Sequence, residues 1–396
     1  MSAPKLLVFS ADSTYSGLAR LPRMLKKSGF EVAVLCWNSA YLAKTCHLDQ
    51  LFLLSKNSFL PFIRTMNSTS LLSQFVEVVK IWQPEIVIFG DEMTVAFAHH
   101  VIRQAAKFST VLPTAVLELL KDSLGSPQFF DATLLKHKTL EVAYELGLRV
   151  PAIASVTMEE AAWQFAEKNG YPVVLKKSFS CAGVGVKVCQ SEMEFSSSLP
   201  AFLPHPPSPI KAFIRKHLWR DWFPVEEALG LQQFIQGRIA MCPVVAIDGE
   251  VLTGFVAIKE LTCSENGPSS VIRLVNCAEA LATTAALIKQ FQFTGFAVAD
   301  FILEEGTNHA YLIEFNPRPG TVGHLGALVG SDLGAALFTR ISGQPWENQP
   351  FVEQEQLIAL FPQEWRRDPN SDNLRQLYHD VPWDDPSLVK AYIASV

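Results

Sequence analysis

The sequence predicts an α/β domain built on an open parallel sheet, followed by a larger domain in which helices alternate with strand hairpins. Two apolar, strand-type segments at 5–10 and 31–36 flank a helical pattern over 16–28, an order typical of a β-α-β unit. An amphipathic helix over 136–147 ends at a glycine shortly before a proline, which indicates a domain boundary. Beyond that boundary, residues 296–320 have the alternation of a β-hairpin.

The rest of the first domain extends the parallel sheet and brings two acids to its edge. A helix is expected over 71–82, and the segment EIVIFG at 85–90 predicts another parallel strand. Asp91 and Glu92 follow that strand directly, and open α/β sheets bind ligands at the carboxyl ends of their strands. The two acids are therefore candidate ligand contacts. The alternative is that they only begin the next helix.

The second domain is predicted from cap, turn and strand patterns. A helix over 157–169 opens with the capping sequence T-x-E-E, and strands expected at 171–176 and 186–189 flank a loop of small residues at 178–185. Five prolines between 199 and 209 predict an exposed irregular connection. Further expected elements are strands at 231–235, 243–247 and 251–255, a turn at Asp248-Gly249 between the last two strands, and helices at 278–291 and 333–342.

The composition is that of a globular protein whose partners are small molecules. The 396 residues are 49% hydrophobic, which suits two or three packed units. The net charge of -6 and the lack of a long basic run argue against a nucleic-acid or anionic-membrane partner. Seven cysteines show no CxxC pair and no zinc-ligand spacing, so we expect reduced thiols in a cytoplasmic protein. We expect neither a signal peptide nor a membrane span, because no apolar run has the required pattern or length.

The hairpin over 296–320, FAVADFILEEGTNHAYLIEFNPRPG, carries the strongest chemical signal in the chain. Positions 300 and 314 are equidistant from Thr307, so a turn centred there places Asp300 opposite Glu314 with their Cβ atoms about 5 Å apart. Asn316 lies two residues beyond Glu314 and therefore shares its face of the sheet. The spacing predicts two carboxylates and an amide around one point.

This group of side chains is suited to a hard cation. Two carboxylates on one face repel each other unless a cation lies between them, and Mg²⁺ prefers oxygen ligands while keeping room for phosphate. Asp300, Glu314 and Asn316 are therefore candidate ligands of one or two Mg²⁺ ions, with Mn²⁺ as an alternative. Arg318 adds a planar cation suited to phosphate or to a developing oxyanion. The alternative is an ordinary hairpin with solvated acids.

A second signal is the segment YPVVLKKSFSCAGVGVKV, in which a loop of small residues joins two strands. Lys176 ends the first strand and supplies a point charge. Ser180, Gly183 and Gly185 in the loop would let backbone N–H groups approach phosphates without obstruction. The loop lacks the helix that follows a Walker P-loop and the spacing of a dinucleotide fingerprint, so neither motif is present. The alternative for this segment is a flexible hairpin.

In combination, these segments resemble the ATP-grasp superfamily over roughly residues 136–343. The resemblance rests on five segments in order: the lysine-led helix KTLEVAYELGLRVP, then YPVVLKKSFSCAGVGV, QQFIQG, GFAVADF, and LIEFNPRPG with a glycine-rich helix start after it. It implies that ATP lies between two α+β lobes, with the loop at 178–185 closing over its phosphates. The implied organisation is a pre-ATP-grasp α/β domain at 1–120, an ATP-grasp domain at 121–343 with a lid lobe at about 155–235 and a metal-binding lobe at about 236–343, and a C-terminal extension at 344–396.

The resemblance also implies roles for individual residues. Lys138 and Lys176 would contact phosphates, although Lys136 competes with Lys138 for this role. The adenine would be cradled by Gln232, Gln233, Phe234 and Ile235. Glu314 would bridge two metal ions, Arg318 would stabilise the acyl-phosphate step, and Lys259 is a further candidate contact to phosphate or substrate, with a solvated strand lysine as its alternative.

Three features depart from the pattern or leave alternatives open. Relatives often carry a ribose-binding acid just after the QQFIQG segment, but here Gly237 is followed by RIAMC. Glu226 and Glu227 could substitute for that acid. His324 is a candidate substrate contact or a histidine that only caps or packs. Cys181 in the loop is expected to be a small filler, because no histidine is close enough in sequence to activate it.

By resemblance, we expect an ATP-dependent ligase that activates a carboxylate as an acyl phosphate and couples it to an amine. Small-molecule carboxylate and amine substrates are then the partners, with amino acids or short peptides as the first expectation, and a homodimer is common among relatives. The alternatives are a carboxylase that forms carboxyphosphate and a nucleotide-binding regulatory module without catalysis. The pattern does not identify the substrates.

Overall fold

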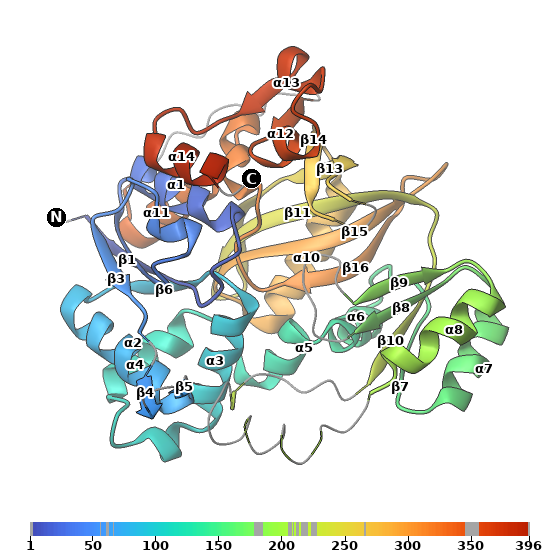
Figure 1. Ribbon diagram of the computed structural model, residues 1–396, viewed down its shortest axis with the longest axis horizontal. Helices are drawn as coiled ribbons and strands as arrows, with labels where there is room; N and C mark the ends of the chain where they lie inside the picture. Colours follow the sequence, from blue (N-terminus) through green and yellow to red (C-terminus); the bar gives the residue numbers. More distant parts are fainter. Residues whose placement is uncertain are drawn as a thin grey trace.

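Three main sheets organise the chain, shown in the computed structural model in Figure 1. The structure describes residues 3–55, 57–60, 63–65, 67–177, 185–204, 208, 210, 214, 221–222, 228–264, 267–344 and 356–394. Among these residues, no helix has both the length and the apolar character needed to cross a membrane. We refer below to the N-terminal sheet, the small sheet and the large sheet.

The N-terminal sheet is parallel, with strand order β3-β2-β1-β6, and confirms the predicted β-α-β start. Side chains of β1 alternate between two cores: Leu6 and Val8 pack on one face, and Leu7 and Phe9 on the other. The expected helix over 16–28 is divided into a 3₁₀ turn and α1. The elements of this region are β1 (Lys5–Phe9), η1 (Gly17–Arg20), α1 (Leu21–Ser28), β2 (Glu31–Cys36), η2 (Tyr41–Ala43), β3 (Gln50–Leu53), β4 (Asn57–Leu60), β5 (Ile63–Thr65), α2 (Ser68–Trp82), β6 (Ile86–Phe89), α3 (Glu92–Arg103), η3 (Ala105–Phe108) and α4 (Thr114–Asp122).

The small sheet is antiparallel, with order β7-β10-β8-β9, and packs against α7 and α8 at the right of Figure 1. Two local predictions are wrong. The capping sequence at Thr157 is not used, because α7 begins at Glu159 after Met158, which makes no side-chain cap bond. Helix α8 continues through Pro200, because Leu199 in that turn is fully buried in the core of this lobe. The elements are β7 (Ile153–Val156), α7 (Glu159–Asn169), β8 (Val173–Lys177), β9 (Val186–Cys189), α8 (Glu192–Phe202) and β10 (Leu229–Gln233).

The large sheet runs β16-β15-β11-β13-β14-β17-β18, with β12 also paired to β11. Helices α10 and α6 cover one face, and the predicted hairpin forms β15 and β16. The elements are η4 (Pro127–Phe129), α5 (Phe130–Leu134), α6 (Lys136–Glu145), β11 (Gly237–Ile247), β12 (Glu250–Gly254), β13 (Val256–Thr262), β14 (Ser269–Val275), α10 (Ala278–Phe291), β15 (Gly295–Glu304), β16 (Ala310–Asn316), η5 (Gly323–Val329) and α11 (Leu333–Ser342).

The N-terminal sheet and the large sheet share one hydrophobic core. Leu6 and Val8 of β1 belong to the same buried cluster as Phe296 and Val298 of β15. Helices α1 and α11 lie at this junction, where Phe30 packs edge-on against Phe338 at 5.2 Å between ring centres. The relative position of the two sheets is therefore set by apolar packing over a broad area.

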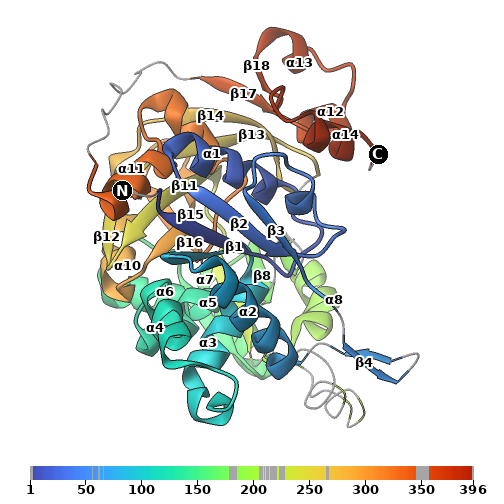
Figure 2. The same cartoon turned by 90° about the vertical axis from the view of Figure 1, so that its left-hand side faces the viewer.

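The C-terminal extension completes the large sheet and contacts the N-terminal region (Figure 2). Strand β17 pairs with β14, and β18 pairs with β17. Tyr392 of α14 is buried, and its hydroxyl donates to the carbonyl of Ser16 at 2.7 Å. This segment, whose role the sequence left open, thus has a structural role. Its elements are β17 (Leu357–Leu360), α12 (Gln363–Arg367), α13 (Asn373–Gln376), β18 (Tyr378–Asp380) and α14 (Pro386–Ala394).

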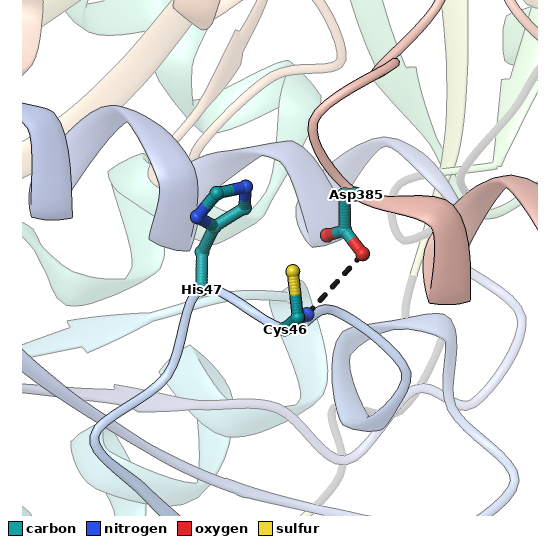
Figure 3. Close-up of side chains that lie close together, drawn as sticks. All are labelled: Cys46, His47 and Asp385. Carbon is teal, nitrogen blue, oxygen red and sulfur yellow. Dashed lines mark hydrogen bonds between the residues drawn. The ribbon is translucent and has the colours of Figure 1, made fainter.

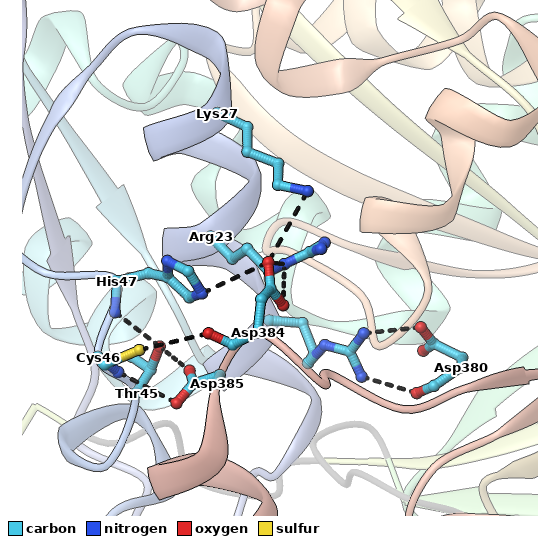
Figure 4. Close-up of polar contacts among 9 residues, drawn as sticks. Arg23, Lys27, Thr45, Cys46, His47, Asp380, Asp384 and Asp385 are labelled. Carbon is cyan, nitrogen blue, oxygen red and sulfur yellow. Dashed lines mark hydrogen bonds and ion pairs between the residues drawn. The ribbon is translucent and has the colours of Figure 1, made fainter.

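Ion pairs of Asp384 with Arg23 and Lys27 join this extension to α1, and Asp385 joins it to the loop that follows β2 (Figure 4). Cys46, His47 and Asp385 lie close together there (Figure 3), and their ligand-type atoms are all within 4.8 Å of one another. However, both carboxylate oxygens of Asp385 already accept protein hydrogens, from the Thr45 hydroxyl and from the backbone N–H groups of Cys46 and Leu388. We therefore interpret the cluster as the cap of α14.

A buried charge network lies between the extension, η1 and η5. Arg20 donates from Nη2 to Oδ1 of Asp380 at 2.7 Å, and His324 Nε2 lies 2.7 Å from the other carboxylate oxygen of Asp380. The side chains of all three residues are less than a tenth exposed. Burial lowers the pKa of His324, so this candidate substrate contact from sequence is engaged in a structural hydrogen bond with Asp380.

Replacing Asp380 by alanine should strongly destabilise the protein, because it leaves the Arg20 guanidinium buried without its charge partner. The expected loss is about 3 to 5 kcal/mol of unfolding free energy, measured as the shift in chemical denaturation. Asp372→Ala is the matched control, since the Asp372 side chain is 75% exposed in its pair with Arg375 and should change stability little. Equal effects of the two substitutions would contradict the structural role of the network.

Candidate functional site

The site is built on the β15–β16 hairpin, where Asp300 lies directly opposite Glu314 as predicted. The pairing is not that of a simple symmetric turn, because Phe301 lies opposite Leu312, so Ile313 is an extra residue in β16. This bulge changes which residues face the core: Leu312 before it and Phe315 after it both pack against α10. Glu314 therefore points away from the core, on the face that carries Asp300.

Asp300 has the features of a ligand for a metal ion. Its Oδ1 is buried and has no hydrogen-bond partner among the described residues, while its Oδ2 receives only a long bond of 3.4 Å from the Asn316 amide. Burial raises the pKa of Asp300 to about 6, with Lys259 opposing this shift and Glu314 adding to it. An orphaned carboxylate oxygen beside a second carboxylate and an amide fits a divalent cation with oxygen ligands.

Two lysines from other elements face this group. Lys136, the first residue of α6, places Nζ 3.2 Å from Oε1 of Glu314. Lys176 of β8 donates to Gln232 Oε1 at 2.6 Å and to the carbonyl of the bulged residue Ile313 at 3.4 Å. Burial lowers the pKa of Lys176 to about 8, with Glu314 opposing the shift. Both lysines are buried in a region rich in carboxylates.

Lys138 is placed differently from the sequence expectation. Its Nζ lies 3.4 Å from Oδ2 of Asp131, and its side chain is 40% exposed. Two residues apart on a helix, Lys136 and Lys138 point in different directions. The structure thus brings Lys136, the alternative named in the sequence analysis, to the site, and places Lys138 away from it.

The segment expected to bind adenine spans the end of β10, which ends at Gln233, two residues earlier than predicted. Gln232 is buried and uses its side chain to hold Lys176, and the Gln233 backbone N–H donates to Ala152. Phe234 and Ile235 lie beyond the strand and are half-buried. Within the described ranges, neither of these two residues uses its backbone N–H in a bond to another residue, so both groups remain available to a ligand.

Part of the expected phosphate loop lies outside the described residues, including Ser180, Cys181 and Gly183. Glu226 and Glu227, the alternative ribose contacts, also lie outside them. Gly185 is described and directly precedes the returning strand β9, with a positive φ of 83°, a conformation that glycine adopts without strain. Its carbonyl accepts from the backbone N–H of Lys177 at 2.9 Å.

Lys259 of β13 lies on the face of the large sheet that carries Asp300. Met241 of β11 pairs with Asp300 on one side and with Ala257 on the other, and Lys259 is two residues beyond Ala257. Its ammonium is the nearby charge that most opposes the raised pKa of Asp300. The structure thus places Lys259 beside the carboxylates, although no direct contact joins them.

Arg318 is held by residues from the N-terminal region. Its Nε donates to Oε1 of Glu92 at 2.6 Å, and its Nη1 donates to the Tyr15 hydroxyl at 3.1 Å and to the Pro319 carbonyl at 3.2 Å. Burial acts against the charged guanidinium, but Glu92 and Tyr15 raise the pKa of Arg318 above its ordinary value. Burial raises the pKa of Tyr15 to about 12, so its hydroxyl stays protonated.

The two acids singled out after β6 have different tasks. Asp91 is buried and caps α3 by accepting from the Thr94 N–H at 2.8 Å. Glu92 instead reaches Arg318 and belongs to the site. The sequence analysis missed Tyr15. Its position just after the carboxyl end of β1 was the available signal, because ligand sites of open α/β sheets form there.

Comparison with known sequences agrees with this geometry. The family model of the carbamoyl-phosphate synthase L chain ATP-binding domain matches residues 136–212. The arginine-specific carbamoyl phosphate synthase large chain of Geobacillus stearothermophilus is 23% identical over 235 residues, which are 59% of this chain and 21% of that protein. The large chain from Sulfurisphaera tokodaii is 25% identical over 197 residues, 49% of this chain and 18% of that protein. This chain thus spans about a fifth of the length of these curated relatives.

Solved structures match over most of the chain. The biotin carboxylase domain of 2-oxoglutarate carboxylase from Hydrogenobacter thermophilus, in complex with MgADP, ADP and bicarbonate, has a TM-score of 0.61 and 16% identity, covering 90% of this chain and 74% of that chain. N5-carboxyaminoimidazole synthetase from Staphylococcus aureus, complexed with ADP, also has a TM-score of 0.61, with 13% identity over 90% of this chain and 82% of that chain. At these identities, the likeness shows a shared fold.

Replacing Asp300 by asparagine should stabilise the ligand-free protein while removing its response to Mg²⁺. The pKa of Asp300 in the folded protein, about 6, lies above its ordinary value of 3.8, so the folded state favours the protonated carboxyl. The wild-type carboxylate therefore costs stability above pH 6, and this cost disappears as the pH falls toward 4. We expect Asp300→Asn to gain about 1 to 2 kcal/mol at pH 7.5 after allowing for partial solvent screening, and nothing at pH 4.

The measurement is the difference in unfolding free energy between wild type and variant from pH 4 to pH 8, with and without Mg²⁺. Asp372→Asn, at an exposed position, is the control and should show no such pH dependence. A loss of stability in Asp300→Asn at pH 7.5 would show that the charged carboxylate is already satisfied by its neighbours.

Proposed function

We propose that this chain, whose fold is that of the ATP-grasp superfamily, is an ATP-dependent ligase that activates a carboxylate as an acyl phosphate and transfers the acyl group to an amine. One observation carries the proposal: two carboxylates, Asp300 with an unpartnered buried oxygen and Glu314 paired with Lys136, lie near lysines from α6 and the small sheet and near Arg318. This arrangement provides oxygen ligands for a cation and positive charge for phosphates in one place.

The residues fit the first half of the reaction. The carboxylate oxygen of the substrate attacks the γ-phosphorus of ATP, the bond to the bridging oxygen breaks, and ADP leaves. Asp300, Glu314 and Asn316 would hold Mg²⁺, which when bound supplies positive charge to the β- and γ-phosphates. Lys136 and Lys176 would bind phosphate oxygens, which replace Glu314 and Gln232 as their partners.

Lys176 is suited to this exchange of partners. Its lowered pKa of about 8 reflects burial with too little compensating negative charge. A triphosphate brings that negative charge, so binding should return the lysine fully to its charged form. The backbone N–H groups of Phe234 and Ile235, just beyond the end of the neighbouring strand β10, are available for the adenine ring.

In the second half, the amine nitrogen attacks the acyl carbon, the bond to the phosphate oxygen breaks, and phosphate leaves with formation of the amide. Arg318 would stabilise the negative charge that develops on the acyl oxygen. A guanidinium has five N–H bonds, and three of them are taken by Glu92, Tyr15 and the Pro319 carbonyl. The two N–H groups on Nη2 have no acceptor among the described residues, so Arg318 offers a ligand one nitrogen.

This limits the kind of group that Arg318 can bind. A two-point contact between arginine and a carboxylate uses two nitrogens on one edge of the guanidinium, and every such edge here includes an occupied nitrogen. Arg318 is therefore suited to a single oxygen atom, such as an oxyanion or one phosphoryl oxygen. Lys259 would provide a second, more mobile charge from the same face of the sheet.

A second candidate is activation of bicarbonate to carboxyphosphate. It is favoured because the similar 2-oxoglutarate carboxylase domain was solved with bicarbonate, and bicarbonate is small enough for an arginine that offers one nitrogen. Both candidates share the ATP-dependent first step and differ in the acid that is activated. A nucleotide-binding module without catalysis is disfavoured because the carboxylates, lysines and arginine are all present together.

The deciding experiment is release of ADP and phosphate from Mg-ATP by the pure protein, screened against amino acids, small carboxylic acids and bicarbonate, each with and without amines. Glu314→Gln should lower the stimulated rate at least 100-fold, because it removes a charged metal ligand, while circular dichroism stays unchanged. Release that needs an acid and an amine identifies the ligase, and release that needs only bicarbonate identifies the second candidate. Nucleotide binding without stimulated release would support the regulatory module.

The two neighbouring lysines give a matched pair of variants. Lys136→Ala should weaken Mg-ATP binding about 10- to 100-fold, because it removes a charged hydrogen-bond donor from the site. Lys138→Ala, two residues further on the same helix, should change it less than about twofold, because its ammonium lies on Asp131 at an exposed position. Isothermal titration with Mg-ATP measures both. The reverse order of effects would restore Lys138 as the phosphate contact.

A further inference from the structure

The guanidinium of Arg318 is fixed by two side chains that lie far away in the sequence. Glu92 binds its Nε and Tyr15 binds its Nη1, and the guanidinium carbon lies 5.0 Å from the centre of the Tyr15 ring. The Tyr15 hydroxyl in turn donates to the Pro319 carbonyl at 2.9 Å. The guanidinium is therefore held at its Nε and Nη1 edge by hydrogen bonds, on its face by the Tyr15 ring, and indirectly by the bond between Tyr15 and the Pro319 carbonyl.

Asp91 fixes both of these contacts relative to each other. Its Oδ2 accepts from the Ser10 hydroxyl at 2.7 Å and from the backbone N–H of Ala11 at 2.7 Å, in the loop that leads to Tyr15. Its Oδ1 caps the first turn of α3, which begins with Glu92. One buried carboxylate thus ties together the two segments that contact Arg318.

The arginine also lies within electrostatic reach of the candidate metal ligands. Glu314 contributes to the raised pKa of Arg318, and Arg318 acts in turn on the pKa of Asp300. A flexible arginine released from Glu92 could pair with either carboxylate and compete with a divalent cation. Holding Nε and Nη1 on the N-terminal side prevents that pairing and leaves Nη2 for a ligand.

We propose that Glu92 and Tyr15 are positioning residues for Arg318: they orient its guanidinium toward the reacting group and keep it away from the metal-binding carboxylates. The catalytic meaning of this inference rests on the proposed function, but the arrangement itself can be tested without it. It follows that the N-terminal sheet contributes to the chemistry by completing the arginine site and not only by binding substrate.

Binding of a free guanidinium tests the arrangement directly. Arg318→Ala removes the side chain and leaves Glu92 and Tyr15 facing the space it occupied. Ethylguanidinium should then bind, seen as a concentration-dependent rise in melting temperature, and should restore part of the ADP release. Arg318→Ala combined with Glu92→Gln should lose both responses. The binding readout needs no substrate, so it decides the inference even if the proposed function fails.

A double-mutant cycle tests whether Glu92 acts through the arginine. Glu92→Gln alone should lower kcat about 10- to 100-fold, as expected for loss of a hydrogen bond between charged groups, with KM for ATP changed less than about twofold. Added to Arg318→Ala, it should lower kcat no further. Tyr15→Phe should behave in the same way with a smaller effect. The rate is that of the substrate pair selected by screening, or of slow Mg-ATP hydrolysis if none is selected.

Glu118→Gln, at an exposed acid paired with Lys121 on α4, is the control and should leave both readouts unchanged. Two results would overturn the inference: ethylguanidinium that binds equally with and without Glu92, or effects of Glu92→Gln that are as large in the Arg318→Ala background as in the wild type. If Arg318→Ala does not fold, Arg318→Lys replaces it. A lysine lacks Nε, so Glu92→Gln should then cost less than about twofold, and an undiminished cost would count against the proposal.

Discussion

One irregularity in the β15–β16 hairpin determines where the candidate site can form. An uninterrupted strand would turn Glu314 to the same side as Leu312, into the core beneath α10. The extra residue Ile313 shifts the alternation by one, so that Leu312 and Phe315 both stay in the core while Glu314 faces Asp300. The same bulge frees the carbonyl of Ile313, which accepts from Lys176. A single backbone feature thus orients one carboxylate and helps to hold the lysine opposite it.

The charges around this hairpin are balanced but not fully satisfied. Lys136 pairs with Glu314, and Arg318 pairs with Glu92, so these groups can be buried at modest cost. Asp300 and Lys176 are the exceptions, since burial shifts the pKa of each toward its neutral form. A buried acid with a raised pKa beside a buried base with a lowered pKa is typical of a site that binds charged ligands. A divalent cation for Asp300 and a phosphate for Lys176 would remove both costs together.

The site belongs to no single sheet. The hairpin comes from the large sheet, Lys176 and Gln232 come from the small sheet, and Glu92 and Tyr15 follow strands of the N-terminal sheet. The N-terminal and large sheets are joined by a shared apolar core. Asp380 of the C-terminal extension contacts Arg20, five residues after Tyr15, and His324, six residues after Arg318. Packing distant from the chemistry therefore sets the geometry of the arginine.

The sequence by itself determined the features that depend on local spacing. Alternation and turn composition were sufficient to predict the parallel start of the chain and the hairpin, because these follow from the period of a strand and the position of a turn. The predicted pairing of Asp300 with Glu314 is confirmed, but the structure achieves it through the bulge at Ile313, which strand period alone does not predict. The order of motifs was sufficient to indicate the fold. Local signals failed where packing outweighed them, as in the unused cap at Thr157 and the helix that continues through Pro200.

Only the tertiary structure decided which side chains complete the site. Lys136 and Lys138 are equivalent in sequence, and the orientation of α6 against β16 is what brings the first to Glu314 and leaves the second on Asp131. The contacts of Arg318 with Glu92 and Tyr15 span 226 and 303 residues, and no local period encodes such a distance. They exist because the shared core fixes the N-terminal sheet against the large sheet, and that packing is a property of the whole chain.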